Sequence, residues 1–399
     1  MKKRSSLFLF FVFYTIHYTG SNFVHPVTPA MFSDLGFPSY MFGVAFASLA
    51  ATSFLFSPFW GKLSDMMGRI STMAISGAGY ALSQYLFGMA TTIPSVIAAR
   101  LICGFFGGGF LVVTMAYVAD CSTPETVGQN MTIYAAITSI CNAAGYFIGG
   151  VIGDHSIKLV FICQTSLLLV NAVVCYFCVG EVEGFSRTER FDRKAMNPFR
   201  AFIDAKEVLT KSLVTFLVAV FVTTFATQAY DQVFNYYLRD AFQFPPSYNG
   251  MIKAATGIIG LIANLTINVW IARKTDGRKS IVTVLGLCAV SLLISIYIPN
   301  IKMYIMANII FYTFNAMYLP ILQALMVEDD SGSNGVTSGL FNTVRSLGMI
   351  AGPLLAGFAY DVNKMSPFMA AAIAFFLGTG ICLANYYQYK NKKAQQNEK

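Results

Sequence analysis

Four ionisable side chains stand inside long apolar stretches, and these residues are the best suited to carry chemistry. Asp231, in TFATQAYDQVFNYYL, is the only carboxylate well inside such a stretch. Lys253 lies at a similar depth in the next stretch, Arg100 stands in ARLICGFFGGG, and His25 directly precedes Pro26. A charge in apolar surroundings is costly unless it faces a polar cavity or a partner. Each of the four is therefore a candidate for binding a proton or a polar substrate.

Each candidate also has a purely structural interpretation. Asp231 could exchange a proton, or it could form an ion pair with Lys253. Arg100 could bind an anionic group, or its guanidinium could tie helices together through backbone carbonyls. His25 titrates near neutral pH, but a single histidine on a helix is more often a satisfied hydrogen-bonding group. The structural interpretation is stronger for His17, which has no motif around it.

Aromatic and amide side chains accompany the ionisable ones. They could line a site for an apolar molecule, although ordinary packing explains any single one of them. The candidates for this lining are Tyr230, Phe234 and Asn315, with Tyr236, Tyr237, Phe314, Met317 and Tyr318 nearby.

The composition indicates what kind of scaffold positions these residues. Of the 399 residues, 56% are hydrophobic and 12% are charged, whereas a soluble domain carries roughly 25% charged residues. Apolar runs of about 20 residues recur along the chain, each long enough to cross a bilayer as a helix. They lack the alternation of barrel strands. We predict an all-α polytopic membrane protein with spans at 7–32, 40–60, 72–91, 95–119, 128–153, 157–179, 208–238, 248–271, 281–299, 302–326, 335–360 and 366–387.

Basic residues set the expected orientation of these twelve spans. Most of the 27 Lys and Arg residues fall at the termini and in every second loop, whereas the opposite loops hold only Lys158, Arg239, Lys302 and Lys364. The positive-inside rule then places both termini in the cytoplasm, with the spans in the cell membrane. The first span resembles a signal peptide, but its length and the lack of a cleavage site favour a retained helix. Anionic lipids account for the net charge of +8 without a nucleic-acid partner.

Motifs for enzymatic or metal chemistry are missing from the sequence. It contains no H-E-x-x-H, no G-x-S-x-G and no G-x-x-x-x-G-K-[ST], which disfavours a metalloprotease, a serine hydrolase and an ATPase. Cys175 and Cys178 form a single C-x-x-C inside an expected helix, which favours apolar packing over metal or redox work. We predict a protein that is not an enzyme and that holds no metal or cofactor.

A charged connector divides the chain into two halves of six spans. We take 1–180 as the first bundle, 181–207 as a cytoplasmic linker, and 208–399 as the second bundle with a cytoplasmic tail. GYFIGGVIGD at 145–154 aligns with GPLLAGFAYD at 352–361, and such internal symmetry is typical of transporters. Small residues there permit close helix packing. The predicted packing residues are Gly145, Gly149, Gly150, Gly348, Gly352, Pro353 and Gly357.

Several segments together resemble the major facilitator superfamily, and within it the twelve-span drug:proton antiporters of multidrug efflux. GKLSDMMGRIS is similar to the family's loop signature G-x-L-[AS]-D-x-x-G-R. The matching residues are Gly61, Leu63, Ser64, Asp65, Gly68 and Arg69. HPVTPAMFSDLG, ARLICGFFGGG and GMIAGPLLAG are similar to the family's motifs in the first, fourth and eleventh helices. Tyr146 departs from the pattern, because the antiporter motif of the fifth helix has proline at that position.

The resemblance implies a fold and an activity. The fold is two pseudo-symmetric six-helix bundles whose first, fourth, seventh and tenth helices line a central cavity. The activity is secondary active export of small amphiphilic molecules by alternating access, with a proton gradient as the energy source. Asp231 and Arg100 would then serve proton coupling and substrate binding, beside His25 and Lys253. The expected partners are a small-molecule substrate and the lipid bilayer, and we expect a monomer.

Other functions stay open. The cavity helices carry one acid, Asp231, and this suits a zwitterionic or anionic substrate better than a lipophilic cation. A metallophore or siderophore is one such cargo. Because Tyr146 stands where the antiporter motif has proline, a proton-coupled importer of a metabolite is an alternative. A membrane sensor on the same fold is a further alternative. The absent catalytic motifs disfavour an intramembrane enzyme.

The signature segment also predicts an inner gate, which we name the latch. Asp65 would dock on the N-terminus of the helix that starts near 335, where unpaired N–H groups attract a carboxylate. Gly61 would let that helix come close, and Gly68 would turn the chain into the next span. The charge pairs expected to complete the latch are Arg69 with Asp120 and Arg345 with Glu328. The alternative, simple anchoring of basic residues at the membrane surface, leaves Asp65 and the glycines unexplained.

Overall fold

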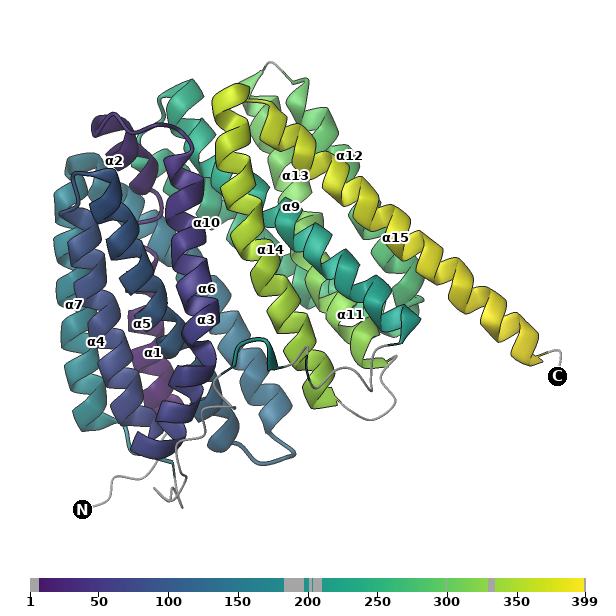
Figure 1. Cartoon of the computed structure of the whole chain (residues 1–399), viewed down its shortest axis with the longest axis horizontal. Coiled ribbons are helices and arrows are strands. Elements are labelled where there is room, and N and C mark those ends of the chain that lie inside the picture. The colour runs from purple at the N-terminus through teal and green to yellow at the C-terminus, as the bar shows by residue number, and fades with distance from the viewer. Residues whose placement is uncertain are drawn as a thin grey trace. The chain divides into compact units, whose positions relative to one another are not determined.

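The structure is a computed structural model that describes residues 7–182, 197–200, 203, 210–298, 300–328 and 334–397. These residues form helices joined by short turns, with no strand among them (Figure 1). The helices are α1 (Leu7–Ser21), α2 (Thr28–Asp34), α3 (Met41–Met67), α4 (Arg69–Gly88), α5 (Ile93–Asp120), α6 (Val127–His155), α7 (Ile157–Cys178), α9 (Lys211–Phe242), α10 (Pro246–Ala263), the π-helix η3 (Asn264–Asn268), α11 (Val269–Lys274), α12 (Gly277–Ile296), α13 (Ile301–Glu328), α14 (Asn334–Val362) and α15 (Ser366–Asn397).

Each of the twelve expected spans coincides with at least one helix among the described residues. In the described part of the chain, nine helices are long and apolar enough to cross a membrane. The eighth expected span is one of the nine, although η3 lies inside it between α10 and α11. The expected spans outside the nine fall on α1, a shorter apolar helix of 15 residues, and on α4 and α14. The chain is thus an all-helical membrane protein, while the count of twelve crossings stays a prediction.

The first expected span, 7–32, is not one continuous helix. Turns separate α1 from α2, and Pro26 and Pro29 account for the break, because proline lacks an amide hydrogen and its ring clashes with the preceding helical turn. Backbone carbonyls at the end of α1 are then open to other helices. Gln164 of α7 donates to one of them, the carbonyl of Gly20, at 2.9 Å.

The signature segment GKLSDMMGRIS is helical almost throughout, although its sequence predicted a connector. α3 runs through it to Met67 and α4 begins at Arg69, so that only Gly68 lies outside a helix. The φ angle of Gly68 is +101°, in the left-handed region that favours glycine. Its amide donates to the carbonyl of Ser64 at 3.1 Å and closes the last turn of α3.

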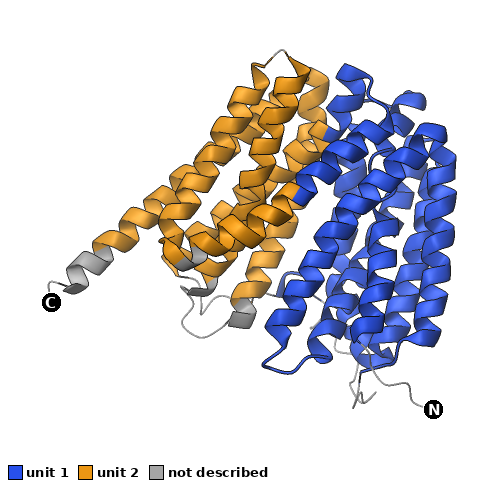
Figure 2. Cartoon of the chain, turned by 180° about the vertical axis from the view of Figure 1, so that it is seen from behind, with its two compact units in different colours: residues 1–200, 235–258 blue, residues 201–234, 259–399 orange. Residues whose placement is uncertain are grey.

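The described chain forms two compact units (Figure 2). Unit 1 consists of residues 1–200 and 235–258, and unit 2 consists of 201–234 and 259–399. The end of α9 and the start of α10 therefore belong to unit 1, although the chain on either side of them belongs to unit 2. Inside unit 1 the rings of Phe42 and Tyr236 stack with centroids 5.0 Å apart.

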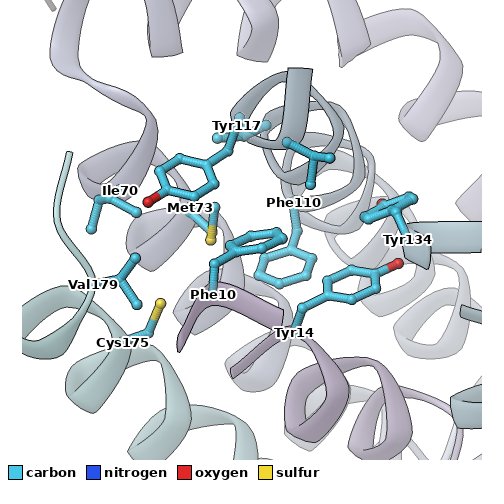
Figure 3. Close-up of a cluster of buried hydrophobic side chains, with 11 residues drawn as sticks. Phe10, Tyr14, Ile70, Met73, Phe110, Tyr117, Tyr134, Cys175 and Val179 are labelled. Atoms are coloured by element: carbon cyan, nitrogen blue, oxygen red, sulfur yellow. The ribbon is translucent and has the colours of Figure 1, made fainter. Parts of the chain in front are cut away.

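A cluster of aromatic side chains packs the interior of unit 1 (Figure 3). Tyr14 of α1 stacks on Tyr134 of α6 with ring centroids 4.6 Å apart. Phe10 packs against Tyr117 of α5 at 4.8 Å. Apolar surface gains little by leaving lipid, so direct packing of this kind holds membrane helices together.

Candidate functional sites

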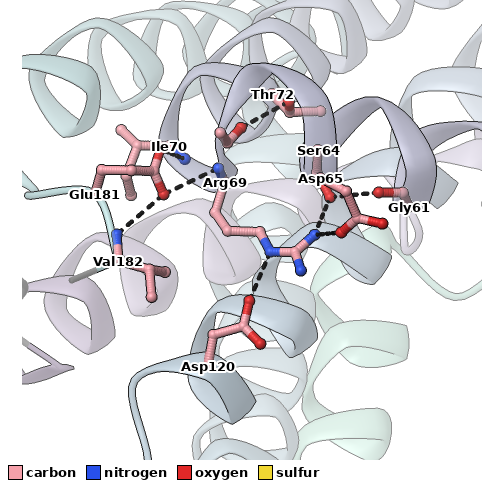
Figure 4. Close-up of polar contacts among 10 residues, drawn as sticks. Gly61, Ser64, Asp65, Arg69, Ile70, Thr72, Asp120, Glu181 and Val182 are labelled. Atoms are coloured by element: carbon pink, nitrogen blue, oxygen red, sulfur yellow. Dashed lines mark hydrogen bonds and ion pairs between the residues drawn. The ribbon is translucent and has the colours of Figure 1, made fainter. Parts of the chain in front are cut away.

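Arg69 joins the ends of three helices at one end of unit 1 (Figure 4). Its Nη1 lies 2.6 Å from Asp65 Oδ1 on α3, and its Nε lies 2.8 Å from Asp120 Oδ2 on α5. The rigid fork of a guanidinium suits such double pairing. Burial alone would lower the pKa of Arg69, but Asp120 and Asp65 outweigh it and raise the pKa above its ordinary value. The predicted pair of Arg69 with Asp120 is therefore present.

Glu181 completes this cluster, and sequence reasoning missed it. Its two carboxylate oxygens accept from the backbone amides of Arg69 and Ile70, each at 3.0 Å (Figure 4). These are the first amides of α4, whose N-cap Gly68 offers no side chain for them. A carboxylate at a helix N-terminus satisfies such amides and interacts favourably with the helix dipole. Glu181 thus fixes the chain that follows α7 to the start of α4.

We expect Glu181→Ala to destabilise unit 1 without touching the ion pairs of Arg69. Loss of an N-terminal cap costs about 1 kcal/mol, which would lower the Tm of the purified protein by roughly 2 to 4 °C. Thermal unfolding in detergent measures this shift. Glu125→Gln is the matched control, because the exposed Glu125 caps no other helix in the described residues. Equal Tm values for Glu181→Ala and the wild type would refute the capping role.

The rest of the latch stays a prediction. The expected docking of Asp65 on α14 concerns residues of two different units and is kept as a prediction. The side chain of Glu328, the expected partner of Arg345, lies outside the described residues. A Cβ at Gly61 would have one described neighbour, Val112 Cγ1 at 3.6 Å, which is ordinary van der Waals contact.

Asp231 of α9 lies beside α13 within unit 2. The hydroxyl of Tyr312 donates to its Oδ1 at 2.7 Å. One helical turn earlier, the hydroxyl of Thr227 lies 2.9 Å from both Asn315 Oδ1 and the Tyr318 hydroxyl. Two of the predicted residues, Asp231 and Asn315, therefore contribute to the same α9–α13 face.

The partners on this face were only partly foreseeable. Tyr230 is fully buried and donates from its hydroxyl to Asn308 of α13. Asn308, Tyr312 and Asn315 occur at intervals of four and three residues, which places them on one side of a helix. That spacing is the sequence signal that would have identified Tyr312. The predicted Phe234 lies on the same face as a buried aromatic, with its ring centroid 5.9 Å from that of Tyr312.

Arg100 is a buried cation without an acidic partner among the described residues. It is 5% exposed, and its Cζ lies 3.6 Å from the ring centroid of Phe87. Its Nε has no hydrogen-bond partner. Nε therefore binds no backbone carbonyl of the described residues, and the choice between the two interpretations of Arg100 stays open. A cation–π contact compensates part of the burial cost, and an anionic group would compensate more.

His25 and Lys253 lie in unit 1. The imidazole of His25 stacks on Tyr146 of α6 with centroids 5.2 Å apart, and its carbonyl, beside the Pro26 break, accepts from Asn235 Nδ2 at 3.2 Å. Tyr146 thus provides a ring for His25 at the position where the resembling motif has proline. Lys253 is partly buried on α10, and its pairing with Asp231 of unit 2 stays a prediction.

The aligned glycines make equivalent contacts in the two units. A Cβ at Gly145 of α6 would overlap the backbone oxygen of Thr19 on α1, and a Cβ at Gly352 of α14 would overlap that of Phe225 on α9. Both helices therefore approach the first helix of their own half as only glycine permits. A Cβ would also come close to Phe23 O at Gly149, to Val27 Cγ1 at Gly153, to Pro246 O at Gly150 (2.7 Å) and to Phe221 O at Gly348 (3.0 Å). Pro353 lies inside α14, in the same turn as Gly352, and Gly357 follows one turn later.

The sequence pattern of the Major Facilitator Superfamily matches residues 10–353. The chain belongs to this superfamily. Among the superfamily's characterised members, Multidrug resistance protein 2 of Bacillus subtilis (strain 168) is 24% identical over 383 residues, covering 96% of this chain and 95% of its own. Quinolone resistance protein NorA of Staphylococcus aureus (strain COL) is 22% identical over 401 residues and is matched over 100% of both chains.

Solved structures of superfamily transporters share the fold. The nucleoside transporter NupG superposes with a TM-score of 0.73 at 13% identity, covering 96% of this chain and 99% of its own. The human organic anion transporter MFSD10 (TETRAN) superposes with a TM-score of 0.68 at 17% identity, covering 94% and 98%. At such identities the likeness concerns the major facilitator fold alone.

Proposed function

We propose that this chain is a proton-coupled secondary active exporter of small amphiphilic molecules that works by alternating access. The observation that carries the proposal is its whole-length similarity to two proteins named for multidrug and quinolone resistance. Energy would come from the proton gradient across the cell membrane rather than from a cofactor. The proposed topology is twelve crossings with both termini in the cytoplasm, and we propose that the protein acts as a monomer.

Asp231 is the residue that we propose exchanges the proton. It lies within α9, one of the helices apolar enough to cross a membrane, and intramembrane acids usually mark substrate or proton pathways. The Tyr312 hydroxyl donates to Oδ1 of Asp231 and holds the carboxylate in place, and we propose that the carboxylate takes up and releases the proton from that position. Proton uptake from outside would accompany substrate release, and proton release to the cytoplasm would reset the carrier.

The buried charge of Arg100 favours a second candidate, an exporter of zwitterionic or anionic metabolites such as metallophores. Its guanidinium has no acidic partner in the described residues, and a substrate carboxylate could neutralise it. We expect Arg100→Gln to raise the KM for an anionic chelating substrate at least about tenfold, on the scale of one lost charge-assisted hydrogen bond, and to leave the KM for a cationic dye unchanged. Initial efflux rates over a concentration series measure both constants. An equal change for both substrates would count against anion binding.

Export itself is tested in cells that overproduce the protein. Loaded with a fluorescent amphiphile, they should lose it faster than cells without the protein, and a protonophore should abolish the difference. Protonophore-insensitive loss would contradict proton coupling. Faster uptake than in control cells would instead favour the importer alternative.

A further inference from the structure

A small cavity lies inside unit 1 between α1, α4, α5 and α7, away from the sites described above. Apolar atoms form most of its lining, from side chains that include Tyr14, Met73 and Phe110. Two polar side chains also face it, His17 of α1 and Asn171 of α7. The cavity has room for a water-sized sphere. Figure 3 shows Tyr14, Met73 and Phe110 in the aromatic cluster that borders it.

Both polar side chains are buried and incompletely hydrogen-bonded. His17 is 2% exposed, and its ring stacks on Phe110 with centroids 3.6 Å apart. Its Nδ1 has no hydrogen-bond partner. Asn171 is 6% exposed, and its Nδ2 donates to the carbonyl of Phe13 at 3.2 Å while its Oδ1 has no partner.

Leaving two such atoms unsatisfied in one apolar interior is costly, because each forfeits the hydrogen bonds that it makes in water. The ring of His17 cannot simply turn away. Phe110 covers one face, and the backbone of α4 passes close by at Gly77, where even a Cβ would lie only 3.2 Å from His17 Cε1. Both atoms therefore need a partner, and the cavity that both residues line has room for a small one.

We propose that this cavity is a binding site for one water molecule that bridges His17 Nδ1 and Asn171 Oδ1. A water can donate to the amide oxygen and either donate to or accept from the imidazole nitrogen, so it satisfies both atoms in either tautomer of His17. The bridge would connect α1 to α7 through the middle of unit 1. The site is a structural element of the bundle and does not depend on the proposed export function.

A double-mutant cycle in the full-length protein tests the bridge. The variants are His17→Phe, Asn171→Leu and the combination, in which a planar ring replaces a planar ring and a branched side chain replaces a branched one of the same length. If a water bridges the two groups, each single variant leaves the other group without its partner and lowers Tm by several degrees. The double variant should then lower Tm by less than the sum of the two single shifts. Met73→Leu, which lines the same cavity without changing a hydrogen-bonding group, is the control and should shift Tm less than either single variant.

A cavity that holds no water gives a different result. In a dry cavity His17→Phe removes an unsatisfied nitrogen and would raise Tm, whereas Asn171→Leu also loses the hydrogen bond to the Phe13 carbonyl, and the shifts of the two single variants would add. That outcome, unchanged Tm values, or additive losses would overturn the proposal. If a variant fails to fold, a high-resolution density map of the wild-type protein decides the question. Density between Nδ1 of His17 and Oδ1 of Asn171 supports the bridge, whereas a clear cavity overturns it. A stoichiometric metal in the purified protein that is lost in His17→Phe would also overturn it.

Discussion

Replacement of Asp231 by Asn should abolish proton-driven efflux while the protein still folds. Asn keeps an oxygen at the position of Oδ1, so the hydrogen bond from Tyr312 survives and α9 and α13 stay joined. It cannot bind or release a proton in the physiological range. We expect transport in reconstituted vesicles to fall to the level of protein-free vesicles, with a Tm close to that of the wild type.

Tyr312→Phe is the matched control for Asp231→Asn. It removes the hydrogen bond that Asp231→Asn retains and keeps the carboxylate, so proton-driven efflux should persist with a changed KM. Efflux at the wild-type rate in Asp231→Asn would contradict the proposed role of the carboxylate. A total loss in Tyr312→Phe, together with full activity in Asp231→Asn, would show that transport depends on the hydrogen bond between α9 and α13 and not on proton exchange at Asp231.

Replacement of Gly145 or Gly352 by Ala should destabilise the protein to a similar extent. In each case the new Cβ would overlap a backbone oxygen of a neighbouring helix, Thr19 O or Phe225 O. Backbone atoms cannot turn away as a flexible side chain can, so the helices must separate. Overpacking of this kind costs about 3 kcal/mol, equivalent to a Tm lower by roughly 6 to 12 °C. Thermal unfolding in detergent measures both shifts.

Gly128→Ala on the same helix as Gly145 is the control, because a Cβ there meets nothing within 4 Å. Alanine favours helix over glycine, so Gly128→Ala should leave Tm unchanged or raise it. If Gly145→Ala and Gly352→Ala behave like Gly128→Ala, the close approach of α6 to α1 and of α14 to α9 is not required for stability.

The helices of the fold were accessible from the sequence because membrane crossing imposes a strong local constraint. An apolar run of about 20 residues has to satisfy its own backbone, and a helix does so. The constraint ends at the membrane surface, so it could not locate the true end of α3 at Met67. It also could not separate α1 from α2, although Pro26 and Pro29 within one apolar run indicate such a break.

The residues of the candidate sites could be predicted from the sequence only in part. Short-range motifs identified Asp65 and Arg69, and the repeated glycine pattern identified Gly145 and Gly352. Glu181 caps α4 from a position 112 residues away from Arg69, and no local pattern encodes a contact at that separation. By contrast, the internal repeat accounts for the similar contacts of Gly145 with Thr19 O and of Gly352 with Phe225 O.

The central claim is that substrate and protons move in opposite directions, and flux in proteoliposomes tests it most directly. Purified protein is reconstituted in vesicles with an imposed pH gradient, and uptake is followed for a panel of cationic, zwitterionic and chelating substrates. We predict that substrate accumulates in vesicles with an acidic interior, as protons leave, and that Asp231→Asn removes the accumulation. Accumulation in vesicles with an alkaline interior, or accumulation that ignores the gradient, would contradict a proton-coupled exporter.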